Sequence, residues 1–125
     1  MIADSDVADL ILEACPSFAA SWDPSENVDE KGRLLYVDAM DLCGHLRTLA
    51  DEDQTAEFPA VFDLIERLHI EGNPYVQELA TIGFLECLHP DERFVPWLRP
   101  VSRRWWDRVD RYWSGDHSAL NAVDP

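Results

Sequence analysis

Apolar side chains recur along the chain at steps of three and four residues, the spacing that gathers them on one face of an α-helix. The clearest row runs from Leu35 to Leu49 in alternating steps of four and three, with Tyr36, Met40 and Cys43 beside it. The same spacing predicts helices over five stretches: about Asp6 to Cys15, about Leu34 to Ala50, Ala56 or Pro59 to Gly72, Pro74 to Leu88, and about Ser102 to Trp113. No stretch has the alternation of a β-strand. We therefore predict an all-α fold, a compact single-domain bundle of about five to six helices.

The third and fourth helices should form a central antiparallel hairpin. Gly72 is suited to end the first helix, Asn73 to cap the second, and Pro74 to occupy its first position. The fourth helix is apolar almost all round, which predicts that neighbouring helices cover it. Gly83 inside this helix costs about 1 kcal/mol relative to alanine. Close approach of another helix would compensate for that cost.

The remaining stretches are predicted as caps, loops and a tail. Asp4 or Ser5 should cap the first helix. The segment from Asp23 to Gly32 should form an exposed acidic loop, and a short helical turn is expected after Pro90. We treat residues 1–125 as a single domain, in which residues 116–125 form a frayed polar tail.

The charge of the chain is strongly negative and unevenly distributed. The 25 Asp and Glu residues outnumber the 10 Lys and Arg residues, which gives a net charge of −15. Such a field repels phosphate backbones, so nucleic-acid binding is disfavoured, and it attracts a protein with a basic surface. Solubility alone is an alternative explanation for the acidity. We predict that seven acids in the first half bind the partner: Glu26, Asp29, Glu30, Asp38, Asp41, Glu52 and Asp53.

The compartment is predicted from three absences in the sequence. The N-terminus lacks the basic and apolar regions of a signal peptide, and no apolar stretch approaches the ~20 residues that span a bilayer. Cys15, Cys43 and Cys87 show no paired spacing, which fits buried thiols in a reducing environment. We therefore expect a cytoplasmic protein without membrane contact.

Two Glu-x-x-His pairs, Glu66 with His69 and Glu86 with His89, are the main candidates for a reactive site. Duplicated pairs of this kind bind two iron ions in some helical bundles. Here both histidines fall in the last turn of a helix, where they would complement the helix dipole from the surface. We favour that structural role, predict no metal or other cofactor, and keep a metal-dependent helical enzyme as an alternative.

Glu86 and the C-terminal aromatic residues are interpreted as structural. Glu86 falls on the apolar stripe of the fourth helix, so we predict a buried carboxylate that pairs with Arg103, Arg104 or a tryptophan N–H. The aromatic side chains of the last helix follow core spacing, although either Trp105 or Trp106 could reach the surface as an interface anchor. No nucleophile triad, phosphate-binding loop or metal-spaced Cys/His set is recognisable, so no catalytic residues are predicted.

Three segments carry a resemblance to a known family. They are residues 61–68 (VFDLIERL), residues 71–86, which begin EGNP and end GFLE, and residues 100–106 (PVSRRWW). They resemble an uncharacterised family of small acidic bacterial helical proteins, over about the last two thirds of the chain. The hairpin is also similar to a HEAT-type repeat. Members of such families are suspected toxin-immunity proteins, and the resemblance implies that role here.

The function expected from these observations is non-catalytic protein binding. The leading hypothesis is an immunity protein or antitoxin-like inhibitor that blocks a basic surface on a toxin. Such a blocker acts by stoichiometric capture and needs no chemistry of its own. The metal-dependent enzyme and a regulatory adaptor without a toxin remain the alternatives.

Overall fold

A computed structural model describes residues 1–121 of the chain. The fold is predominantly α-helical, as the periodicity predicted. Its elements in chain order are α1 (Asp4–Ala14), α2 (Pro16–Ala19), β1 (Val28–Asp29), β2 (Gly32–Arg33), α3 (Leu35–Asp51), α4 (Phe58–Glu71), α5 (Pro74–Glu78), the π-helical η1 (Leu79–Leu85), α6 (Glu86–Leu88), the 3₁₀ helix η2 (Glu92–Trp97) and α7 (Pro100–Trp113).

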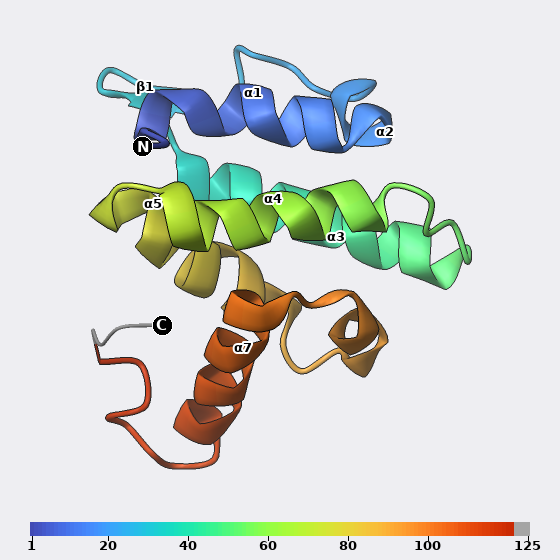
Figure 1. The fold of residues 1–125 in the computed structure, drawn as a ribbon. Helices are drawn as coiled ribbons and strands as arrows, with labels where there is room; N and C mark the ends of the chain where they lie inside the picture. The colour runs from blue at the N-terminus through green and yellow to red at the C-terminus, as the bar shows by residue number, and fades with distance from the viewer. Residues whose placement is uncertain (122–125) are drawn as a thin grey trace.

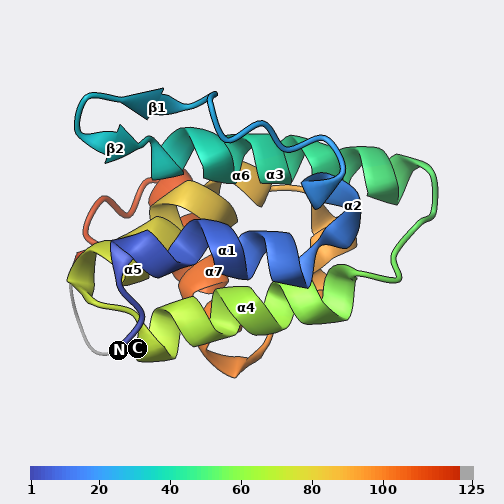
Figure 2. The ribbon, with the colours of Figure 1, turned by 90° about the horizontal axis from the view of Figure 1, so that it is seen from above.

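The helices are arranged in layers. In Figure 1, α1 lies above α3 and α4, the α5–η1–α6 segment lies beneath them, and α7 is lowest. The view from above shows that α1 lies between α3 and α4 (Figure 2). The buried faces of these layers form one hydrophobic cluster that extends from the N-terminus to Trp106.

The apolar segment Pro74–Leu88 lies at the centre, as predicted. It contacts α3, α4 and α7 through its π-helical middle, where six of the seven residues are buried. The predicted close approach at Gly83 is confirmed, because a Cβ there would lie 3.4 Å from the Ala39 Cβ on α3. The lack of a side chain at Gly83 thus allows α3 to pack against the central segment.

The turn between α4 and α5 is also as predicted. The Asn73 side chain accepts a hydrogen bond from the Val76 amide at 2.9 Å and so caps α5. Only glycine fits at position 72, because a Cβ on Gly72 would lie 2.4 Å from a backbone oxygen of α4. The amide of Ile2 donates to Glu71, and the amide of Asn73 donates to Ile2. These bonds tie the N-terminus to the turn.

Several boundaries differ from the prediction. The first helix is capped at Ala3, whose amide donates to Asp6, because Asp4 already belongs to the helix. The acidic loop contains a small antiparallel hairpin, β1–β2, which the sequence pattern did not indicate. In the predicted tail, Ala119 is buried and the amide of Ser118 donates to Asp116, while residues 122–125 of that tail lie outside the described part of the chain. No helix in residues 1–121 has the length and apolar character needed to cross a membrane.

Candidate functional site

The acids predicted to bind a partner occupy two positions beside α3. Glu26, Asp29 and Glu30 lie in or next to the β1–β2 hairpin, while Glu52 and Asp53 follow the C-terminal end of α3. These five and Asp41 on α3 are exposed, and none of the six forms an ion pair with another residue in the described part of the chain. Their charges therefore act mainly on the surrounding solvent.

The seventh acid, Asp38, was predicted as a contact residue, and this prediction is wrong. Asp38 is 0% exposed. Its two oxygens accept hydrogen bonds from Nε and Nη2 of Arg33, each at 2.9 Å. Asn27 donates a third bond to the same carboxylate at 3.0 Å. A buried carboxylate must be paired to remain charged, and Arg33 supplies a bidentate partner that β2 brings over the start of α3.

Arg33 extends this clamp to the loop backbone. Its guanidinium donates to the carbonyls of Pro24 and Glu26 and lies 4.3 Å from the ring centroid of Trp22. The hydrogen bonds with Asp38 raise the pKa of Arg33 further above its ordinary value. One cation thus holds both sides of the acidic loop against α3.

Asn27 completes the attachment of the loop. Its side-chain amide bridges Asp38 and Asp41, with a bond of 2.8 Å to the latter. Its backbone is in the left-handed region at φ 56°, and its carbonyl accepts from the Leu34 amide. Asparagine tolerates this conformation better than most residues. We call the set of Asn27, Arg33 and Asp38 the loop clamp. It holds the exposed acids in fixed positions.

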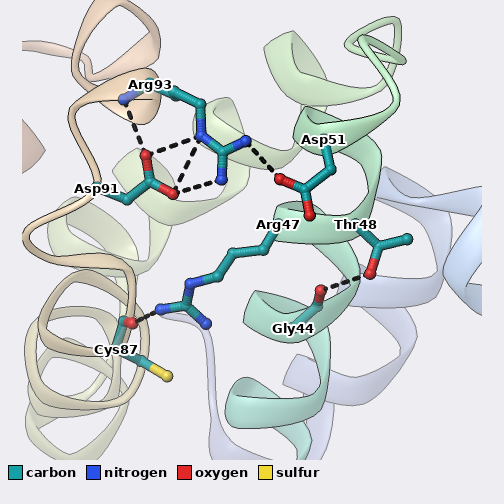
Figure 3. A network of polar contacts seen from close by, with 7 residues as sticks. All are labelled: Gly44, Arg47, Thr48, Asp51, Cys87, Asp91 and Arg93. Atoms are coloured by element: carbon teal, nitrogen blue, oxygen red, sulfur yellow. Dashed lines mark hydrogen bonds and ion pairs between the residues drawn. The ribbon is translucent and has the colours of Figure 1, made fainter.

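A second network of polar contacts secures the other end of α3 (Figure 3). Arg93 lies between Asp51 and Asp91, with bonds of 2.7 Å to each. Arg47 donates to the carbonyl of Cys87 and so satisfies a backbone acceptor at the end of α6. These contacts join α3 to α6 and to the start of η2.

Exposed apolar side chains lie among the acids, and the sequence reading missed them. Val28 on β1, Leu34 before α3, and Val37 and Met40 on α3 are all exposed. Met40 was predicted to lie beside the core seam, but it is 59% exposed. A helical projection of α3 would have predicted this exposed face. In that projection Val37, Met40 and Gly44 lie within about 60° of one another, on the side opposite the buried Leu42.

The first Glu-x-x-His pair has structural partners. His69 is buried rather than on the surface as predicted, and its two ring nitrogens contact the Ile65 carbonyl and the Thr81 hydroxyl, each at 3.0 Å. Burial lowers the pKa of His69 to about 4.

The other member of this pair, Glu66, accepts hydrogen bonds from the Ser102 hydroxyl and from the amides of Val101 and Ser102. Burial raises the pKa of Glu66, but these bonds outweigh it and lower the pKa overall. Glu66 therefore caps α7.

The second pair is separate from the first. His89 contacts Asp110 at 2.9 Å, with its own side chain largely buried. Glu86 is only half-buried, and in residues 1–121 no ion pair joins it to Arg103 or Arg104. The carboxylate that is fully buried is Asp38 instead. No group of three or more potential metal ligands occurs in the described part of the chain.

A serine, a histidine and a carboxylate also meet at α2. The Ser17 hydroxyl donates to Glu57 at 2.5 Å, and its oxygen lies 2.7 Å from Nε2 of His45. The Ser17 amide donates to the same glutamate, which thereby holds the start of α2. In a nucleophile triad the acid orients the histidine, whereas here Glu57 contacts the serine itself. The arrangement serves to attach α2 to α3 and α4.

The aromatic residues of α7 are mostly sheltered. Trp106 is buried, and Trp105 is half-buried with its ring stacked 6.3 Å from His69. Trp106 therefore does not reach the surface, while Trp105 lies at the edge of the core and is only partly exposed. Trp113, at the end of α7, is 61% exposed.

Two of the three cysteines come together in the fold, although their spacing in the sequence shows no pairing. The thiol of Cys43 on α3 donates to the Phe84 carbonyl at 3.7 Å and lies beside Cys87 on α6. The Cys43 thiol and the nearby Arg47 guanidinium lower the pKa of Cys87 to about 6, against the opposing effect of partial burial. Burial raises the pKa of Cys15, which lies elsewhere beside Ser17.

Comparison with known protein families gives a match that spans most of the chain. No curated protein and no solved structure matches the chain. Residues 8–114 match the family described as "Domain of unknown function (DUF7674)". This match extends from within α1 to the end of α7 and includes the loop clamp. The chain therefore belongs to the DUF7674 family.

Proposed function

We propose that this protein is a non-catalytic protein-binding domain that presents its acidic loop and the acids beside α3 to a basic surface of a partner. The observation that carries the proposal is the loop clamp. It uses one ion pair, between Arg33 and the buried Asp38, to hold a loop whose own acids are exposed and have no ion-pair partner among residues 1–121. A surface ordered before binding loses less conformational entropy when the partner arrives.

The charge distribution supports capture of a basic partner. Uncompensated carboxylates of one sign steer an oppositely charged protein and raise its association rate by factors of about 10 to 1,000. Within this class we propose an immunity protein or antitoxin-like inhibitor, because blocking a basic cleft requires only stoichiometric capture. A regulatory adaptor would use the same surface on a partner that is not toxic.

The alternative of a metal-dependent enzyme receives less support. Both nitrogens of His69 and both oxygens of Glu66 already have partners within the protein. A metal bound there would have to displace the cap of α7 and the hydrogen bond with Thr81. The geometry favours a binding surface over a reaction centre.

The test compares two variants with the same net charge. The site variant carries Glu26→Gln, Asp29→Asn, Glu30→Gln and Asp41→Asn, which preserve the shapes of the side chains. The control variant neutralises four exposed acids on α1, η2 and α7, namely Asp9, Glu13, Glu92 and Asp107. Each protein is used to capture the partner from a lysate of the source cells. The partner is then purified, and its association rate is measured at about 50 and about 300 mM salt, which bracket strong and weak screening.

We expect the control variant to associate like the wild type and the site variant to associate at least about tenfold more slowly at low salt, with a flatter salt dependence. Equal rates for the two variants would contradict the proposed surface. Inhibition of a toxic enzyme at one-to-one stoichiometry would support the immunity role. A partner without toxic activity would favour the adaptor instead.

A further inference from the structure

Gly44 differs from the other glycines of the chain. The sequence contains five, and all lie in the described part. Gly32 and Gly115 have φ values of +123° and +113°, which disfavour other residues. A Cβ at Gly72 would lie 2.4 Å from a backbone oxygen, and one at Gly83 would lie 2.7 Å from a leucine side chain. A Cβ at Gly44 would meet nothing within 4 Å.

The position of Gly44 makes this difference informative. It lies in the interior of α3, a helix of 17 residues, where glycine is less favourable than alanine. Neither the backbone conformation nor a neighbouring group among residues 1–121 requires it. The position is exposed, so the space left by the missing side chain is open to an external group.

Gly44 lies within a row of exposed residues on α3. Val37 and Met40 precede it on the same face and are 37% and 59% exposed, and Thr48 follows one turn later. The Thr48 hydroxyl donates to the Gly44 carbonyl at 3.2 Å, as Figure 3 shows, so this polar group is satisfied within the helix. At 1.5 Å per residue, the row from Val37 to Thr48 is about 16 Å long. We call it the α3 strip.

Acids border the α3 strip on one side. Asp41 lies on one flank of the helix by its spacing, and Glu52 follows the C-terminal end of α3. Asn27 bonds to Asp41, which places the clamped loop and its acids against that flank. Figure 2 shows the β1–β2 hairpin beyond the N-terminal half of α3, at the edge of the helical body. The strip is thus apolar, has no side chain at Gly44, and carries negative charge along one edge.

We propose that the α3 strip docks an amphipathic helix of the partner, which places its apolar face across Gly44 and its lysine or arginine side chains toward Asp41, Glu52 and the loop. This inference rests on the proposed binding function and specifies the form of the contact. Helix axes approach to about 8 Å only where side chains between them are small, and Gly44 provides such a point. A second copy of the chain would bring acids of the same sign together, which opposes self-association through this face.

The test uses a synthetic peptide of about 18 residues as the probe, long enough to cover the strip. One face of the peptide carries leucine and alanine, and the other carries lysine and arginine. A scrambled peptide of identical composition serves as the control for charge alone. Binding is followed by amide chemical shifts and by titration of wild type, Gly44→Ala, Gly44→Leu and Ala60→Leu. Ala60→Leu places the same side chain at an exposed position on α4.

We expect the amphipathic peptide to shift the amides of residues 37–48. Gly44→Leu should weaken its binding by at least about tenfold, while Ala60→Leu should leave it unchanged. Gly44→Ala should raise the melting temperature by about 3–5 °C, which would show that the glycine is not needed for folding. Unchanged binding by Gly44→Leu, or shifts confined to other helices, would overturn the inference.

The two proposals fail in different ways when the acid-neutralised site variant is titrated with the same peptides. If Gly44→Leu binds normally while the acid-neutralised site variant does not, the acidic surface stands and the α3 strip is refuted. If the site variant binds normally while Gly44→Leu does not, the strip stands and the proposed charge steering fails. Equal binding of the amphipathic and scrambled peptides would also refute the strip, because only the former has an apolar face.

Discussion

Replacing Asp38 by asparagine tests the loop clamp. The new side chain keeps one acceptor but turns an N–H group toward Arg33, which already offers only donors. Removing one member of a fully buried ion pair costs about 3–5 kcal/mol. The Arg33 side chain is 22% exposed and belongs to a surface hairpin, so part of its hydration can be recovered. We therefore expect Asp38→Asn to lower the free energy of unfolding by about 2–3 kcal/mol.

A matched control is available on α4. Asp63 also pairs with an arginine, Arg99, at 2.7 Å, but both side chains are more than half exposed. Asp63→Asn should therefore cost no more than about 0.5 kcal/mol. Urea unfolding followed by tryptophan fluorescence measures both variants, and backbone amide exchange in residues 23–33 reports on the loop. Equal losses of stability in the two variants would refute the clamp, as would unchanged exchange in the loop of Asp38→Asn.

Two further predictions follow from the titratable groups. Burial holds the folded pKa of His69 at about 4, below the 6.5 of an unfolded histidine, so its contribution to stability is complete above pH 6.5 and is lost as the pH falls toward 4. The loss should reach about 3 kcal/mol relative to His69→Gln in urea unfolding, and parallel pH profiles would contradict it. Cys87 should react with iodoacetamide with a midpoint near pH 6, well before Cys15, because Cys43 and Arg47 stabilise its thiolate. Peptide mapping measures both sites, and labelling of Cys15 at the same pH would contradict this order.

Local patterns in the sequence were sufficient to predict the helices and the central position of the segment Pro74–Leu88. The apolar run from Pro74 to Leu88 predicted the covered segment, and Gly72 and Asn73 predicted the turn before it. These features depend on residues within a few positions of one another. The packing at Gly83 was also foreseen, because a glycine inside an apolar helix implies close approach of a neighbour.

The loop clamp could not be predicted in the same way. Asp38 lies at the border of the apolar face of α3, where a polar residue is usually assigned to the solvent. Its partner Arg33 lies only five residues earlier, but on β2 rather than on the helix, and Asn27 reaches the same carboxylate from the far side of the β1–β2 hairpin. A pairing between a helix residue and residues of a preceding hairpin leaves no helical period in the sequence.

The site was also misjudged where tertiary packing covers a helix end. His69 lies in the last turn of α4, a position that suggested a surface histidine. In the fold, Thr81 from the central segment contacts its ring, and Trp105 from α7 stacks beside it. Conversely, Met40 was grouped with the core from its apolar character alone, although its place on the helical projection indicates the outer face.

Hydrogen exchange in the complex of this protein with its captured partner tests most directly whether the acidic side of the molecule is the binding surface. Amides of the loop from Glu26 to Arg33 and of α3 up to Thr48 should exchange more slowly in the complex than in the free protein. The amides of α7 should exchange at the same rate in both. Protection confined to α7 and the exposed Trp113, with no change in the loop or α3, would contradict it.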